Sequence, residues 1–204
     1  MYIDDQVLSK IHSGSDYSFS IYEAERTEVI LGRSRKKEKD VYVQNCTADN
    51  IPILRRIGGG GTVLLSKGII VISIAGKTFF PYRLKEHMNA VNRVIITSLN
   101  RLGIDNLSIK GISDLALENK KILGSSLSRK RDIVLYQGSL LLSPDFKLFD
   151  QYLKHPDREP DYREGRAHRD FLTSLRKEGC KINKTRVISA LREELIKRIP
   201  WSQL

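Results

Sequence analysis

The feature that most constrains this chain is a run of four glycines, residues 58–61, set between two arginines and an apolar segment. Residues 54–65 read Leu-Arg-Arg-Ile-Gly-Gly-Gly-Gly-Thr-Val-Leu-Leu. Glycine has no Cβ, so the backbone can turn sharply and a ligand can lie against the main chain. Successive N–H groups can also point together into a hollow that favours anions. A flexible linker is usually mixed with serine and flanked by polar residues. The run therefore predicts a loop that cradles a ligand, with a structural turn as the alternative.

The size and charge of the chain narrow its class. Its 204 residues suit one domain with a sizeable core. The net charge of +11 indicates an acidic partner, which can be a nucleic acid, an anionic ligand or an acidic protein. The longest apolar run, residues 69–75, is far shorter than the roughly 20 residues of a membrane-spanning helix. The N-terminus lacks the pattern of a signal peptide. We expect a cytoplasmic protein without a membrane segment.

Hydrophobic periodicity predicts the secondary structure. Apolar residues recur at steps of three and four over residues 82–102, which indicates an amphipathic helix that ends at Gly103. Residues 69–75 lack polar alternation and predict a central strand buried on both faces. Further strands are expected at residues 18–22, 28–31, 62–65, 107–110, 114–118, 121–126 and 133–142. Further helices are expected at residues 4–12, 41–49, 145–153 and 185–198, the last of them ended by Pro200. This order predicts an α+β fold rather than a doubly wound sheet.

Two charged segments interrupt this pattern. Residues 33–40 predict a solvated loop, or a basic lip over an anionic ligand. Residues 155–168 change to charged residues with two prolines, which predicts a mobile loop, and we extend this excursion to residue 183, before a terminal helix within residues 184–204.

Lone histidines and cysteines are weak candidates for chemistry in this chain. His155 and His168 are isolated, which argues against metal binding, and His87 is expected on the surface of its helix. Cys46 is expected to be a small packed side chain. With Cys180 as the one other cysteine, neither a disulfide framework nor a four-thiolate zinc site can form.

Two short stretches add candidate chemistry to the glycine run. Residues 111–115, Gly-Ile-Ser-Asp-Leu, place Asp114 at the start of a strand. Lys121 opens an apolar strand that breaks at Gly124. A lysine at a strand end can hold a point charge over a polyanion, and an aspartate can bind Mg²⁺ together with phosphate. Taken singly each signal is weak, because most such residues are simply solvated.

Together, four motifs resemble those of the lipoate–protein ligase A family, which is similar in fold to the biotin protein ligases. They are Arg-Arg-Ile-Gly-Gly-Gly-Gly-Thr-Val, Gly-Ile-Ser-Asp-Leu, Lys-Ile-Leu-Gly-Ser-Ser and Tyr-Gln-Gly-Ser-Leu-Leu-Leu at residues 136–142. The likeness runs from about residue 28 to the helix after residue 142. It implies an α+β catalytic domain with mixed β-sheets flanked by helices. It also implies that lipoate and ATP give lipoyl-AMP, with Mg²⁺, and that the lipoyl group passes to a lysine of an acidic lipoyl carrier domain. That carrier would be a 2-oxoacid dehydrogenase E2 or a glycine-cleavage H-like protein.

The resemblance assigns roles residue by residue. Lys121 matches the catalytic lysine beside the carboxyl and phosphate oxygens. Asp114 matches the acidic residue that binds Mg²⁺ and the adenylate. The residues matched to the lining of the substrate and adenylate site are Arg56, Gly59, Gly60, Gly61, Thr62, Val63, Gly124, Ser125 and Gly138.

The chain also departs from the family pattern. Leu65, Ser66 and Ile69 stand where the family commonly has a histidine, an acidic residue and an asparagine. Gln137 replaces a histidine, and Ser113 replaces an asparagine. The ligand contacts and the acyl substrate that the resemblance implies are therefore left open by these positions.

The small C-terminal accessory domain of many ligases is also missing from residues 1–204, which we expect to form a single catalytic domain. A separate small accessory protein is therefore a possible partner.

Three alternatives compete with a ligase. An octanoyl or lipoyl acyltransferase of the same superfamily needs a cysteine downstream of the lysine motif, and none lies between Gly138 and Gly179. A biotin ligase would carry a Gly-Arg-Gly-Arg type of loop, which is missing. A non-catalytic nucleic-acid-binding module would interleave aromatic with basic residues, whereas the 7% aromatic residues here are scattered. We therefore expect no nucleic-acid partner.

Overall fold

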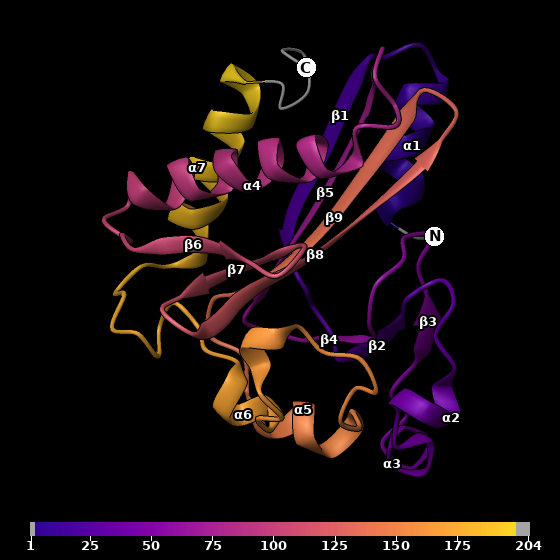
Figure 1. The fold of residues 1–204 in the computed structure, drawn as a ribbon, viewed down its shortest axis with the longest axis vertical. Helices are drawn as coiled ribbons and strands as arrows, with labels where there is room; N and C mark the ends of the chain where they lie inside the picture. The colour runs from indigo at the N-terminus through magenta and orange to yellow at the C-terminus, as the bar shows by residue number, and fades with distance from the viewer. Residues whose placement is uncertain (1–2, 199–204) are drawn as a thin grey trace.

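The computed structural model describes residues 3–198 and shows an α+β fold, as predicted, with two sheets (Figure 1). The larger sheet has six antiparallel strands in the order β1-β5-β9-β8-β7-β6. Its strands are β1 (Tyr17–Glu23), β5 (Ile69–Lys77), β6 (Leu107–Lys110), β7 (Asp114–Leu117), β8 (Lys120–Lys130) and β9 (Ile133–Leu141). The smaller sheet has the order β3-β2-β4, with β2 (Glu28–Leu31), β3 (Ile53–Arg55) and β4 (Val63–Leu65).

Strand β5 is an interior strand, as its unbroken apolar sequence predicted. It pairs with β1 on one side and with β9 on the other. Ile70, Ile72 and Ile74 are buried in the main core, whereas Ala75 is buried in a separate cluster with Val7 of helix α1 (Ile3–His12). Both faces of the strand are thus covered, which explains why it has no polar alternation.

Helices α4 (Leu84–Asn100) and α7 (Lys184–Lys197) pack in the main core. The predicted apolar face of α4 is buried at Met88, Val91, Ile95 and Leu99. Asn183 caps α7 by accepting a hydrogen bond from the Arg186 N–H at 3.0 Å. Pro200, predicted to end this helix, lies outside the described residues.

The prediction for His87 was wrong. The side chain is fully buried rather than at the surface, and its Nε2 lies 2.8 Å from the Phe80 carbonyl. The loop before α4 folds over this part of the helix, so the apolar stripe alone could not show that the position is covered.

A second core lies beside the smaller sheet. Its buried residues include Val29, Leu64 and Phe149 with Cys46, which is buried as predicted. The short helices of this region are α2 (Lys37–Asp40), α3 (Val43–Ala48) and α5 (Lys147–Tyr152). Residues 37–40 were expected as part of a loop and form one helical turn instead.

Residues 153–172, which we call the connecting segment, run from the second core to the larger sheet. They include a 3₁₀ turn, η1 (Asp161–Arg163), and helix α6 (His168–Phe171). At one end the Lys154 N–H donates to the Asp40 carbonyl at 2.8 Å. Just past the other end, the Thr173 N–H donates to the Lys121 carbonyl at 2.9 Å. Among the described residues, no helix combines the length and apolarity needed to cross a membrane.

Candidate functional site

Two adjoining cavities lie where the two sheets and the connecting segment meet. The inner cavity has a volume of about 210 Å³ and is lined by both sheets, for example by Val71 and Gln137 of the larger and Ile30 of the smaller. The outer cavity has a volume of about 780 Å³ and is lined in addition by the connecting segment. Both cavities share Thr62, Asp114 and several neighbours, so they form one continuous site.

The charged centre of this site is the pair formed by Lys121 and Asp114. The Lys121 Nζ lies 2.8 Å from Asp114 Oδ1, and the aspartate is buried. Strand pairing of β7 with β8 places the two side chains together, with a register shift between Leu115 and Ala116. A Cβ on Gly124 would lie 2.8 Å from the Lys121 Cε and Nζ. Glycine at position 124 therefore makes the space in which the ammonium sits.

Tyr162 of the connecting segment completes this centre. Its hydroxyl donates a hydrogen bond to Asp114 Oδ2 at 2.9 Å. Burial, and next the negative charge of Asp114, raise the pKa of Tyr162, so the phenol stays protonated and acts as a donor. Both carboxylate oxygens of Asp114 thus have a partner.

The glycine loop is held in place by Arg56. Its Nη2 donates to the carbonyls of Gly59 at 2.6 Å and Gly61 at 2.7 Å, and its Nε donates to Gly59 at 3.1 Å. In a trans peptide the N–H points opposite to the C=O. The N–H groups of Gly60 and Thr62 therefore point away from Arg56, which is an arrangement that can receive an anion.

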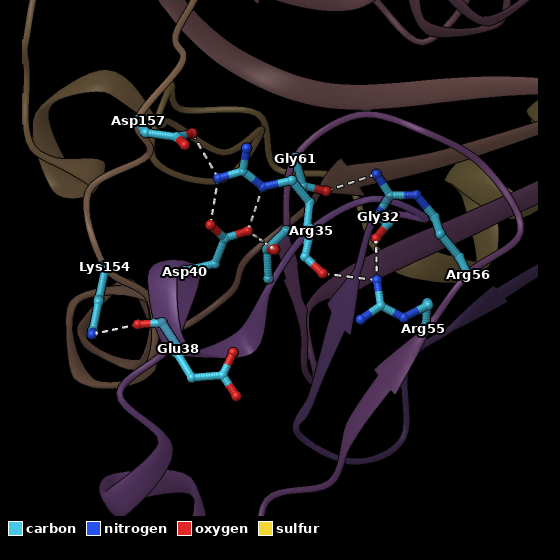
Figure 2. A network of polar contacts seen from close by, with 10 residues as sticks. Gly32, Arg35, Glu38, Asp40, Arg55, Arg56, Gly61, Lys154 and Asp157 are labelled. Carbon is cyan, nitrogen blue, oxygen red and sulfur yellow. Dashed lines mark hydrogen bonds and ion pairs between the residues drawn. The ribbon is translucent and has the colours of Figure 1, made fainter.

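The neighbouring arginine organises a second loop (Figure 2). The Arg55 Nη1 donates to the carbonyls of Gly32 at 2.9 Å and Arg35 at 2.8 Å, as Figure 2 shows. It also donates to the Arg33 carbonyl at 2.8 Å. The two loops touch, because the Arg33 N–H donates to the Gly58 carbonyl at 2.9 Å. Two consecutive arginines at the end of β3 thus fix two adjacent loops.

Asp40 connects these loops to the connecting segment (Figure 2). This buried carboxylate accepts hydrogen bonds from Arg35, with its Nε at 2.6 Å, and from the Thr62 hydroxyl. Burial opposes ionisation of Asp40, but the bonds from Arg35 and Thr62 outweigh it, so its pKa is lowered. Arg35 also binds Asp157 at 2.7 Å. The basic lip was the alternative prediction for residues 33–40. Its Arg35 is already paired with Asp40 and Asp157.

His168 lines the outer cavity as a neutral imidazole. Burial, followed by the positive charges of Arg163, His155 and Lys121, lowers the pKa of His168 to about 4. It is thus uncharged near neutral pH and adds no positive charge to the site.

Asp114 is the metal ligand that the sequence predicts at this site, and the outer cavity is also lined by Asp40, Glu159, Asp161 and His168. No cluster of three or more histidine, cysteine or acidic side chains suitable for a metal occurs among residues 3–198 as described. Mg²⁺ in nucleotide sites commonly takes one or two carboxylates, with phosphate oxygens and water as the other ligands. A single buried carboxylate therefore fits a Mg²⁺ ion that arrives with a polyphosphate, and does not fit a metal held by the protein alone.

The structure brings nearly all predicted site residues together. Those that line the inner cavity are Arg56, Gly60, Gly61, Thr62, Val63, Asp114, Lys121, Gly124, Ser125 and Gly138. Gly59 does not line it, and its part is to offer its carbonyl to Arg56. A Cβ on Gly138 would lie 3.0 Å from the Tyr136 ring, so this glycine makes room for a buried tyrosine.

Sequence reasoning missed Gly32, Asp40 and Tyr162. Gly32 had a usable signal, because a glycine directly after a predicted strand often marks a close backbone approach. Asp40 and Tyr162 lie in charged segments. Asp40 binds Thr62, which is 22 positions away, and Tyr162 binds Asp114, which is 48 positions away, so no local pattern indicated either residue.

Comparisons with known proteins show the family of the chain. The model of the lipoyl protein ligase A/B catalytic domain matches residues 1–196. A probable lipoate-protein ligase A from Mycoplasma pneumoniae is 27% identical over 154 residues, which are 74% of this chain. The match covers 44% of that protein, so the chain spans less than half of its length.

Two solved structures share the fold. A bipartite lipoate protein ligase from Thermoplasma acidophilum, studied with its E2 lipoyl domain, superposes with a TM-score of 0.81 at 20% identity, over 95% of this chain and 76% of its own. A lipoate-protein ligase A bound with ATP gives a TM-score of 0.80 at 19% identity, over 95% and 77% of the two chains. Because the family model matches residues 1–196, which are almost the whole chain, this chain belongs to the family of lipoyl protein ligase A/B catalytic domains.

Proposed function

We propose that this chain catalyses lipoate–protein ligation: it converts lipoate and ATP to lipoyl-AMP and pyrophosphate, and then transfers the lipoyl group to a carrier lysine. The observation that carries this proposal is the position of the Lys121 ammonium. It lines both cavities and is fixed by Asp114 at 2.8 Å. An acyl chain in the inner cavity and a nucleotide in the outer cavity would meet at this ammonium.

The first step joins two anions, and the site is built to offset their repulsion. A lipoate carboxylate oxygen attacks the α-phosphorus of ATP, the bond from that phosphorus to the bridging oxygen breaks, and pyrophosphate leaves with the electron pair. The Lys121 ammonium and the N–H groups of Gly60 and Thr62 are donors that can stabilise the charge on the phosphoryl oxygens. Because the ion pair with Asp114 already holds Lys121 in the space beside Gly124, the ammonium needs little rearrangement during the reaction.

Asp114 would hold Mg²⁺ together with the nucleotide phosphates. When bound, the ion would neutralise part of the phosphate charge. The hydroxyl of Tyr162 keeps the carboxylate oriented.

The second step needs no nucleophile from the chain itself. The ε-amine of the carrier lysine attacks the acyl carbonyl, the bond to AMP breaks, AMP leaves with the electron pair, and the amine loses a proton to solvent. Cys46 is buried in the second core, Cys180 packs against the first core, and neither lines either cavity. This favours a ligase over an acyltransferase that works through a cysteine thioester.

The proposal also includes the protein partners of the chain. The Thermoplasma ligase is described as bipartite and with an E2 lipoyl domain. By analogy, we propose an acidic carrier of the E2 or H-protein type. We also propose a small separate accessory protein that accelerates the first step, which the chain alone carries out only slowly. The net charge of +11 fits an acidic carrier. We further propose a cytoplasmic location, where ATP is available.

The test is direct. The purified chain is mixed with lipoate, Mg-ATP and an apo carrier domain, and the carrier is weighed by mass spectrometry. We expect the mass of the carrier to rise by one lipoyl group only when ATP is present. Modification of the carrier from an acylated protein donor without ATP would support the acyltransferase instead. Tight binding of nucleic acid without modification would support the third alternative.

A further inference from the structure

The loop between β5 and α4 carries an exposed group of aromatic side chains. Phe79 is 97% exposed, Tyr82 is 80% exposed and Phe80 is 41% exposed. We call these three residues the aromatic surface. None of them lines the inner or the outer cavity. Aromatic residues and arginine are enriched in protein interfaces, and contiguous exposed apolar groups commonly mark such sites.

Hydrogen bonds hold the loop between β5 and α4 in place. The Thr78 N–H donates to the Asp132 carbonyl at 2.9 Å, and the Phe80 N–H donates to the Thr78 hydroxyl at 3.1 Å. The Phe80 carbonyl receives the buried His87 Nε2 at 2.8 Å. A loop held in this way loses little conformational freedom when a partner binds, which favours affinity.

Arginines hold two of the aromatic rings. The Arg83 guanidinium lies 4.5 Å from the centre of the Phe80 ring, and Arg129 lies 4.5 Å from the centre of the Tyr82 ring. The segments around the aromatic surface, residues 77–86 and 129–132, contain six basic and two acidic residues. An acidic protein with an apolar contact area complements this combination.

The aromatic surface lies within reach of the site along one strand. Arg129 belongs to β8, which also carries Lys121. Ser126 of β8 lines the inner cavity, and the glycine loop lies against it, because a Cβ on Gly58 would be 2.8 Å from the Ser126 Oγ. From Ser126 to Arg129 is three residues, or about 10 Å along a strand. Because successive residues of a strand point to opposite faces, the Arg129 and Ser126 side chains lie on opposite faces of the sheet. A domain about 30 Å across that binds over the end of the β8–β9 hairpin is large enough to extend from the aromatic surface past the sheet to the glycine loop.

We infer that the aromatic surface is the docking site of the acidic carrier domain whose lysine receives the lipoyl group. This inference rests on the proposed function and adds where its protein substrate binds. Aromatic contacts would give affinity, and the surrounding arginines and lysines would steer the acidic domain toward the site.

The experiment uses the whole chain and the double variant Phe79→Ser/Tyr82→Ser. Transfer from chemically prepared lipoyl-AMP is measured while the concentration of the apo carrier is varied. We expect the KM for the carrier to rise about tenfold or more, as for the loss of two aromatic anchors, with kcat and pyrophosphate release from lipoate and ATP unchanged. The Kd of the apo carrier, measured by calorimetry without nucleotide, is expected to rise in parallel.

The matched control is Ile196→Ser, which removes an exposed apolar side chain, 72% accessible, from helix α7. It is expected to leave the KM and Kd for the carrier unchanged. A normal KM in the double variant overturns the inference. A double variant that loses only pyrophosphate release also overturns it. A double variant that no longer self-associates but has a normal KM overturns it as well, because a second copy of the chain would then be the partner at the aromatic surface.

Failure of the proposed function gives a different pattern. If the wild-type chain carries out neither half-reaction, the ligase proposal fails, and the calorimetric Kd of the double variant still decides the docking site. A weakened Kd in that case supports docking without ligation, and an unchanged Kd rejects both.

Discussion

Gly32 and Gly60 approach each other so closely that a Cβ on Gly32 would lie 2.1 Å from the Gly60 carbonyl oxygen. Gly32 follows directly after β2, and Gly60 belongs to the glycine loop at the site. Because Arg56 holds the carbonyls of Gly59 and Gly61, the loop cannot move away without losing those bonds. The shape of the loop therefore depends on a glycine that does not line either cavity.

We predict that Gly32→Ala displaces the glycine loop and lowers adenylate formation by about tenfold or more, because small displacements of positioning groups have large effects on rate. Pyrophosphate release from lipoate and ATP measures this. Gly59→Ala is the control for the fold, since a Cβ there meets no atom within 4 Å, and its thermal unfolding should match that of the wild type. Normal pyrophosphate release by Gly32→Ala would show that the loop adapts without consequence.

Lys121→Ala is expected to retain the fold and to lower adenylate formation by about 10² to 10³, the scale for the loss of one transition-state donor. Lys121→Arg should not restore the rate, because a planar guanidinium spreads the charge that an ammonium concentrates at one point. Circular dichroism checks the fold, and pyrophosphate release checks the rate. Near-normal release by both variants would remove Lys121 from the mechanism.

Much of the fold could be predicted because its signals are local. The uninterrupted apolar run of β5 and the spacing of Val91, Ile95 and Leu99 in α4 each show their burial in the sequence itself. The small residues near Lys121 could be placed for a similar reason, since they occur within short motifs. His87 could not be placed, because its burial depends on Phe80 in another segment.

The connecting segment shows the limit of composition as a guide. Its charges and prolines predicted a mobile excursion, yet Arg163 is buried, with its Nε 3.2 Å from Glu159 and its guanidinium 4.9 Å from the Phe171 ring. The composition of a segment is the same whether its charged side chains pair and stack with one another or are solvated, so composition cannot distinguish the two cases. Tyr162 and Asp114 are 48 residues apart in the chain, and neither local sequence contains a pattern that predicts their hydrogen bond.

Tyr162→Phe tests whether this contact positions Asp114. Hydrogen bonds to charged groups contribute about 1.5–3 kcal/mol, and water can replace part of the bond, so we expect adenylate formation to fall about tenfold. The apparent affinity for Mg²⁺ in the same assay should weaken, which a purely structural role would not cause. Tyr42→Phe is the control, because that ring is partly exposed and lines neither cavity. Unchanged rate and Mg²⁺ dependence would show that Asp114 needs no support from Tyr162.

His168 gives the chain a predictable response to acid. Its pKa is about 4 in the folded chain, against about 6.5 when unfolded. Between these values the unfolded state binds more protons, so stability rises with pH and falls as pH drops from about 6.5 to about 4. We predict a loss of about 1–3 kcal/mol across this window. Urea unfolding at several pH values should show a smaller loss in His168→Gln, whereas His12→Gln, at an exposed position, should behave as the wild type. Equal acid sensitivity in both variants would contradict the assignment.

The two cysteines distinguish the proposed ligase from a thioester-forming acyltransferase. Cys46 lies in an apolar core and Cys180 against another, and burial raises the pKa of each thiol, so neither readily forms the thiolate that attacks an acyl group. We predict that the double variant Cys46→Ala/Cys180→Ala transfers the lipoyl group from lipoyl-AMP to the carrier at the wild-type rate. Its stability should fall, since alanine leaves a small cavity at Cys46, so the assay is run well below the melting temperature. A thioester trapped on either sulfur by mass spectrometry, or loss of transfer in a folded double variant, would instead place a cysteine on the reaction path and favour the acyltransferase.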